Sequence, residues 1–240
     1  MNLNDILKAH ADSRVRPGEW GADGMKTIAL VTQKGGAGKS TLASSLAVAA
    51  FQAGERVCLI DMDPQATLTV WGKTRGEADV PVVAASPAKL PAVLRALADK
   101  GVTLVFIDTP GAEGAASSAA MAAAQLCVIP SRPTAFDLWA SANTRKALKD
   151  MKGDYVFLLN QCPPAQQSAR VEEGMAALEA MGGLLSPLVL ARVDYQEAAR
   201  RGWGVTELNP NGSAAGEMRA LWASLKKRLA KAARPAKKAA

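Results

Sequence analysis

Short apolar runs alternate with stretches of helical length along most of this chain, and this alternation constrains the fold more than any other feature. Each run holds five or six mainly apolar residues, which is typical of strands buried in a parallel sheet. The runs cover residues 27–32, 56–61, 104–108, 126–130, 155–160 and 188–192. The alternation predicts an α/β fold with a mostly parallel central sheet flanked by helices on both faces.

A glycine-rich segment, residues 33–41, joins the first run to a helix-like stretch over 39–53. The phosphate-binding loop G-x-x-x-x-G-K-[ST] would place glycine where this chain has Gln33, but Gly38, Lys39 and Ser40 match it. A tight turn needs glycine for its shape alone, which is the structural alternative. Because a strand, three glycines, a Lys-Ser pair and a helix occur in register, we interpret the segment as the P-loop of a P-loop NTPase.

The P-loop interpretation gives each polar group a task. Glycines let successive backbone N–H groups turn towards an anion, and the N-terminus of the following helix adds its dipole. Lys39 would reach the β- and γ-phosphates, the Ser40 hydroxyl would bind Mg²⁺, and Thr41 would hydrogen-bond the α-phosphate. The loop therefore predicts a bound nucleotide phosphate chain together with Mg²⁺.

Carboxylates follow two of the predicted strands. Asp108 ends the run 104–108, where a Walker-B aspartate would hold the Mg²⁺ shell. Asp61 and Asp63 end the run 56–61 and would lie near the γ-phosphate. Taken singly, each could be a helix-capping or turn aspartate. Because ligands of such sheets bind beyond the carboxyl ends of the strands, the three are expected to share one site with the loop.

The combination resembles the ParA/MinD family of ATPases. Segment 34–41 (KGGAGKST) is similar to the deviant Walker-A signature of that family, 61–65 (DMDPQ) to the DxDPQ motif of its ParA branch, and 108–110 (DTP) to its Walker-B ending. Segments 129–134 and 198–207 also fit, so the similarity covers about residues 25–230. Gly111 stands where many members have a second proline.

The resemblance implies a homodimer that forms when ATP is bound. Lys34 would cross the interface to the phosphates of the partner subunit, as an arginine finger does. Asp63 would orient the attacking water, and Asp61 would lie near the Mg²⁺ shell. Asn160 would contact the adenine edge; its alternative is a strand-end turn residue. The resemblance thus implies ATP binding by Lys34, Gly35, Gly36, Ala37, Gly38, Lys39, Ser40, Thr41 and Asn160, and metal binding by Ser40, Asp61 and Asp108.

The charge of the chain is concentrated at one end. The sequence has 29 Lys+Arg and 22 Asp+Glu, a net charge of +7, and residues 226–240 hold seven cations and no acid, which leaves 22 against 22 before them. We expect an N-terminal extension or linker at 1–24, an ATPase domain at 25–231 and a basic, disordered tail at 232–240.

The longest apolar run, 115–129, is broken by polar residues and falls short of the ~18 residues that a transmembrane helix needs. No secretory signal is visible, and three scattered cysteines indicate no disulfide framework, so we expect a cytoplasmic protein.

The last predicted helix, 217–231, places Met218, Leu221, Trp222, Leu225 and Leu229 on one stripe. This stripe could pack on the sheet, or the basic amphipathic helix could lie on anionic lipid as the MinD branch implies, or its cations could contact DNA phosphates. Packing is favoured for the stripe. DNA is favoured for the cations, because the end of the chain lacks large apolar side chains. The predicted DNA-binding residues are Lys226, Lys227, Arg228, Lys231, Arg234, Lys237, Lys238, Arg200 and Arg201.

These expectations combine into a function. The leading hypothesis is a weak ATPase, stimulated by a partner and by DNA, that dimerises with ATP, binds nucleoid DNA non-specifically and segregates or positions a cargo. The cargo would be a plasmid, a chromosome region or a protein assembly, joined through a ParB-like or other adaptor. Residues 1–24 leave no room for a helix-turn-helix module. The alternative is a MinD-like membrane-associated positioning ATPase; a metabolic P-loop enzyme is disfavoured because no separate substrate constellation is visible.

Overall fold

The computed structural model describes residues 24–77, 79–164 and 168–232, and within these it holds a six-stranded parallel sheet in the order β3-β2-β4-β1-β5-β6. The strands are β1 (Lys26–Leu30), β2 (Val57–Asp61), β3 (Val82–Ala84), β4 (Leu104–Asp108), β5 (Leu126–Ser131) and β6 (Tyr155–Leu159). The register places Leu30 beside Asp108 and Asp61 beside Asp108, so the carboxyl ends of β1, β4 and β2 meet at one edge. The predicted α/β class and parallel sheet are confirmed.

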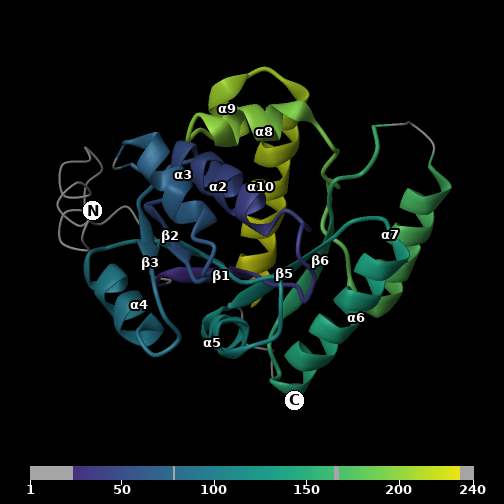
Figure 1. Cartoon of the computed structure of the whole chain (residues 1–240), viewed down its shortest axis with the longest axis horizontal. Helices are drawn as coiled ribbons and strands as arrows, with labels where there is room; N and C mark the ends of the chain where they lie inside the picture. Colours follow the sequence, from purple (N-terminus) through teal and green to yellow (C-terminus); the bar gives the residue numbers. More distant parts are fainter. Residues whose placement is uncertain (1–23, 78, 165–167, 233–240) are drawn as a thin grey trace, which may run out of the picture.

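Helices cover both faces of the sheet (Figure 1). Alternate residues of each strand point to opposite faces, so Ile28 and Leu30 join one buried cluster while Ala29 joins the other. The first cluster contains side chains of α2 (Lys39–Gln52), α3 (Thr67–Arg75), α8 (Val193–Arg200), α9 (Val205–Leu208) and α10 (Ser213–Ala232). The second contains side chains of α4 (Leu90–Asp99), α5 (Ala115–Ala123), α6 (Ala135–Asp150) and α7 (Ala169–Gly182).

Two strand assignments needed correction. The predicted run at 188–192 is not a strand: it makes one isolated bridge, Leu190 to Cys162, and crosses the end of β6 as a loop. Val189 and Ala191 donate backbone hydrogen bonds to Leu159 and Cys162 (2.9 and 2.7 Å), but within the described residues the segment extends this pairing no further. The sheet also contains β3, which the sequence analysis missed. This strand has only three residues, two half-buried and one exposed, so it does not form a recognisable apolar run.

The apolar stripe of the last helix belongs to the core. Met218, Leu221 and Leu225 are fully buried and Trp222 and Leu229 nearly so, with the Trp222 ring edge-on to Phe106 at a centroid distance of 6.3 Å. Packing, the favoured alternative for this stripe, is confirmed, and its apolar side chains are not available to lipid. Among the described helices, none is both long enough and apolar enough to cross a membrane. Most of the predicted linker and tail, with Arg234, Lys237 and Lys238, lies outside the described residues.

Candidate functional site

The predicted P-loop lies between the end of β1 and the start of α2. Its backbone is left-handed at Gly36 (φ 78°) and at Gly38 (φ 85°), a conformation that favours glycine. A Cβ atom at Gly38 would lie 2.5 Å from the Asn160 side-chain nitrogen. Gly38 is therefore required both for the turn and for the close approach of β6.

Two side chains at the end of β6 fix the orientation of this loop. Asn160 Nδ2 donates to the Ala37 carbonyl (2.8 Å), and Gln161 Nε2 donates to the Gly36 carbonyl (2.9 Å). Since the carbonyls turn towards β6, the intervening N–H groups are free to face an anion. The buried Asn160 thus supports the P-loop, a role that the sequence did not predict, and its contact with the adenine edge stays a prediction. Gln161 was missed, because nothing in the sequence shows that a strand-end glutamine meets a loop 125 residues earlier.

Asp108, Ser40 and Lys39 lie together where the loop meets β4. Ser40 Oγ donates to Asp108 Oδ2 (2.5 Å), while Asp108 Oδ1 is buried and has no hydrogen-bond partner among the described residues. Burial raises the pKa of Asp108 to about 7, against the opposing effects of Ser40 and Lys39. Burial likewise lowers the pKa of Lys39, while Asp108 and Asp63 act in the opposite sense.

The two other predicted carboxylates follow β2. Asp61 is buried and already satisfied: Oδ1 accepts from the Asp63 N–H (3.1 Å), and Oδ2 accepts from the backbone N–H and the hydroxyl of Thr69 (both 2.8 Å). Asp63 Oδ1 accepts the Gln65 N–H (2.9 Å), and no described residue hydrogen-bonds its other carboxylate oxygen. The structure thus brings Asp61, Asp63 and Asp108 to one edge, with Asp61 shaping the turn that carries Asp63.

These residues fit Mg²⁺ and a nucleotide. The unpartnered buried Asp108 oxygen and the Ser40 hydroxyl are the hard oxygen ligands that Mg²⁺ prefers, and a cation there would offset the cost of burying the carboxylate. A bound ATP would supply the phosphoryl group for transfer to water. Within the described residues, no group of three or more His, Cys, Asp and Glu side chains forms a metal site. A hollow of about 400 Å³ beside the loop, bounded by Gly38, Thr41, Asn160, Arg192 and Tyr195, has room for a nucleoside.

Lys34 is half-buried at the rim of this site. Contacts with other segments fix its two neighbours in the chain, Gln33 and Gly35. The Gln33 N–H donates to Thr144 Oγ1 (3.2 Å), and the Gln33 side chain hydrogen-bonds Glu113. A Cβ atom at Gly111 would lie 2.7 Å from the Gly35 Cα, so the backbones of the two loops touch. This contact explains why glycine, and not a second proline, follows Pro110 here.

A comparison with known families agrees with this geometry. The CobQ/CobB/MinD/ParA nucleotide binding domain matches residues 28–205, most of the chain. The chain belongs to this family. The match supports the ParA/MinD ATPase assignment made from segments 34–41, 61–65 and 108–110.

Relatives of this ParA/MinD ATPase include positioning proteins. It is 31% identical over 203 residues to the "Maintenance of carboxysome distribution protein A" of Halothiobacillus neapolitanus, covering 80% of this chain and 91% of that protein. It is 27% identical to the protein ParA of Rhizobium radiobacter, covering 71% and 81%. Its fold is similar to that of apo McdA from Cyanothece, with a TM-score of 0.72, 19% identity and coverage of 85% and 99%. The cell division ATPase MinD of Pyrococcus furiosus gives a TM-score of 0.67 at 23% identity, with the same coverage.

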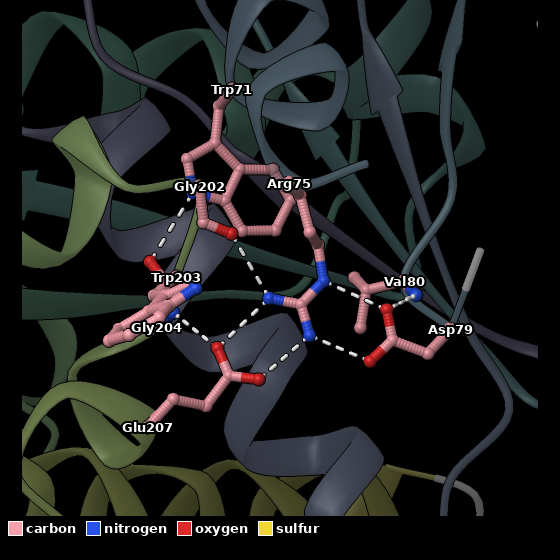
Figure 2. Close-up of polar contacts among 8 residues, drawn as sticks. All are labelled: Trp71, Arg75, Asp79, Val80, Gly202, Trp203, Gly204 and Glu207. Carbon is pink, nitrogen blue, oxygen red and sulfur yellow. Dashed lines mark hydrogen bonds and ion pairs between the residues drawn. The ribbon is translucent and has the colours of Figure 1, made fainter. Parts of the chain in front are cut away.

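In this ParA/MinD ATPase, helix α3 links the Asp61 turn to the loop between α8 and α9. Thr69 near its start holds Asp61, and Arg75 at its end is surrounded by acceptors (Figure 2). The Arg75 guanidinium donates five hydrogen bonds, two to Asp79, two to Glu207 and one to the Gly202 carbonyl. Sequence reasoning missed this cluster, since 132 residues separate Arg75 from Glu207 and no local pattern pairs them.

The cations predicted to bind DNA fall into two groups. Lys226 pairs with Glu55 (2.9 Å) and Arg228 with Asp154 (2.5 Å); these acids precede β2 and β6, so this group lies at the amino edge of the sheet. Arg200 pairs with Glu197 (2.8 Å) and lines a hollow together with Ser40, at the opposite edge. The Arg201 guanidinium stacks on Trp203, 5.4 Å from the ring centroid. Lys227 is exposed, and Lys231 lies in α10 with a side chain outside the described atoms.

Proposed function

We propose that this ParA/MinD ATPase dimerises when ATP binds, binds DNA non-specifically in that state, and positions a cargo whose adaptor stimulates hydrolysis. The observation that carries the proposal is the placement of its two loop lysines. Lys39 is buried beside Asp108, where it serves its own nucleotide, whereas Lys34 lies at the half-buried rim with both neighbours fixed. A cation held at the rim is suited to reach phosphates across an interface.

The relatives support a positioning role but leave the cargo open. One relative is named for the maintenance of carboxysome distribution, and another is the chromosome-partitioning ATPase Soj of Thermus thermophilus. The first indicates a protein assembly and the second a chromosome. We therefore propose a plasmid, a chromosome region or a protein assembly as the cargo, and a ParB-like or other adaptor as the partner.

DNA is preferred to a membrane as the surface. The membrane alternative needs an apolar face that can enter lipid, and the stripe of α10 lies in the core. The cations of its last turns, by contrast, are accessible to a polyanion, since the Lys226 side chain is 60% exposed even in its ion pair. Phosphate contacts of this kind bind DNA without reading its sequence.

The dimer is tested with Lys34→Ala. We expect the variant to bind ATP with wild-type affinity but to lose ATP-dependent dimerisation, measured by light scattering after size exclusion, and to lose turnover. Lys89→Ala, which removes an exposed lysine at the start of α4, is the matched control and should behave as wild type. Normal hydrolysis by Lys34→Ala would refute a role for this lysine across the interface.

The choice between DNA and a membrane as the binding partner is tested by co-sedimentation with plasmid DNA and with anionic liposomes, each with and without ATP. ATP-dependent liposome binding without DNA binding would replace the proposal by the MinD-like alternative. Removing residues 233–240 deletes three cations, and at ~0.9 per phosphate contact the slope of log K against log salt should become shallower by at most about 2.7 per subunit. An unchanged slope would show that these three do not contact DNA.

A further inference from the structure

Arg132 is held beside the P-loop by a buried acid. It is the first residue after β5, which pairs with β1, so the segment that follows β5 runs next to the loop that follows β1. A Cβ atom built on Gly36 would lie 3.8 Å from Arg132 Nη1 and, apart from the two residues next to Gly36 in the chain, within 4 Å of no other described residue. The tip of the guanidinium therefore reaches the middle of the phosphate-binding loop.

One side of the guanidinium is fully engaged. Nε donates to Asp137 Oδ1 (2.9 Å) and Nη2 to Asp137 Oδ2 (3.1 Å), and the Asp137 side chain is 2% exposed. Asp137 is fixed in turn by the Thr134 hydroxyl (2.6 Å), at the N-terminus of α6. A bidentate carboxylate on this side restrains the rotation of the guanidinium and thereby aims the other side.

The other side of the guanidinium, at Nη1, has no hydrogen-bond or ion-pair partner among the residues that the structure describes. No hydrogen bond or ion pair within the described part of the chain uses Nη1, and the side chain keeps 32% of its surface exposed. An arginine needed only to neutralise Asp137 could direct its remaining donors to bulk water. Here they point to the loop whose backbone N–H groups are free to bind an anion, because Asn160 and Gln161 hold its carbonyls.

We propose that Arg132 donates a hydrogen bond from Nη1 to a phosphate oxygen of the nucleotide, and that Asp137 is its positioning residue. The contact itself does not require the proposed nucleotide-driven dimer. Only the choice between the nucleotide of the same subunit and that of the partner rests on that dimer. A phosphate in the same subunit and one held by the partner have the same chemistry, so the experiment must separate them.

The first measurement is the affinity of Arg132→Ala for a non-hydrolysable Mg-ATP analogue. It is made at protein concentrations low enough that the chain stays monomeric. If the contact is within one subunit, the affinity should fall about tenfold to a hundredfold, the usual effect of losing a hydrogen bond between charged groups. If the contact crosses to the partner, this affinity should stay unchanged while ATP-dependent dimerisation and turnover fall by a similar factor. Unchanged affinity, dimerisation and turnover together would overturn the proposal.

Mixing Arg132→Ala with Lys34→Ala separates the two sources again. If Arg132 acts within its own subunit and Lys34 on the partner, each mixed dimer has one intact site. A mixed dimer keeps one Lys34 contact, so the mixture should regain turnover that neither variant shows alone, reaching about a quarter of the wild-type rate if the chains pair at random. If both residues act on the partner's nucleotide, no site is intact and no turnover returns. Should the wild-type chain fail to dimerise with ATP, the proposed function fails, and the affinity measurement alone then decides on Arg132.

Three further variants guard against a purely structural effect. Arg145→Ala removes an arginine of α6 that bonds the Tyr155 hydroxyl, and it should leave affinity and turnover unchanged. Arg132→Lys keeps the charge, but a lysine cannot both hold Asp137 and reach the loop. Its affinity for the Mg-ATP analogue should therefore be less than about threefold higher than that of Arg132→Ala. If Arg132→Ala does not fold, because Asp137 is left buried without its partner, the double variant Arg132→Ala/Asp137→Ala removes both charges and permits the same measurements.

Discussion

The cluster around Arg75 makes the sharpest prediction about stability (Figure 2). Its side chain is 3% exposed and donates five hydrogen bonds, while its partners Asp79 and Glu207 keep 28% and 26% of their side-chain surface. Breaking a fully buried ion pair costs about 3–5 kcal/mol, because the remaining charge loses its compensation. Since both acids can partly regain water, we expect Arg75→Met to lower the free energy of unfolding by about 2–4 kcal/mol.

The measurement is urea denaturation followed by circular dichroism, with the slope of the transition compared between variants. Arg200→Ala is the matched control: its pair with Glu197 is within one helix and 67% and 41% exposed, so water screens it and its removal should leave the urea transition close to that of wild type. Glu207→Gln should fall between the two, because Arg75 keeps Asp79 while Glu207 loses its charge. If Arg75→Met stays within about 0.5 kcal/mol of wild type, the cluster does not stabilise the fold as its geometry implies.

Three other predictions follow from single contacts. Gly38→Ala should abolish binding of a fluorescent ATP analogue, because its Cβ atom would meet Asn160 at 2.5 Å and its φ of 85° is strained; binding within threefold of wild type would contradict this. Leu225→Ala should lower the free energy of unfolding by about 2–5 kcal/mol without changing liposome binding, since this side chain is buried in the core. Burial raises the pKa values of Asp79 and Asp137, but hydrogen bonds from their arginines outweigh it and hold both pKa values low. These acids therefore contribute stability above about pH 4 that is lost as the pH falls towards their folded pKa values, and an acid titration of Asp137→Asn should show less of this loss.

The sequence predicted the parts of the molecule that depend on short-range patterns. Five of the six strands and the P-loop follow from apolar runs and from glycines next to a Lys-Ser pair. The prediction of a strand at 188–192 was wrong because an apolar segment meets the strand criterion even where it forms a single bridge, here from Leu190 to Cys162. The short β3 was missed for the opposite reason, since it buries too little to show as a run.

The supporting side chains of the site depend on contacts between distant segments. Asn160 and Gln161 reach a loop more than a hundred residues earlier, and no spacing rule pairs them with it. Asp137 carried a usable signal: Thr134 three residues before it is the pattern of a helix N-cap, and the cap places Asp137 where Arg132 can reach it. Roles that depend on a nucleotide or a second subunit, such as that of Lys34, stay predictions.

The separation of the cations bears on how ATP could control DNA binding. Lys226 and Arg228 lie at the amino edge of the sheet, whereas the P-loop and Arg200 lie at the carboxyl edge. In a dimer formed through the carboxyl edges, the two amino edges face away from each other, so pairing brings the Arg200 and Arg201 groups of both subunits together and moves the other groups apart. Linked sites raise affinity only where both can engage at once. If the ATP-bound dimer binds DNA as we propose, the gain in DNA affinity on ATP binding should therefore depend on Arg200 more than on the cations of α10, and Arg200→Ala should reduce that gain in a DNA co-sedimentation assay.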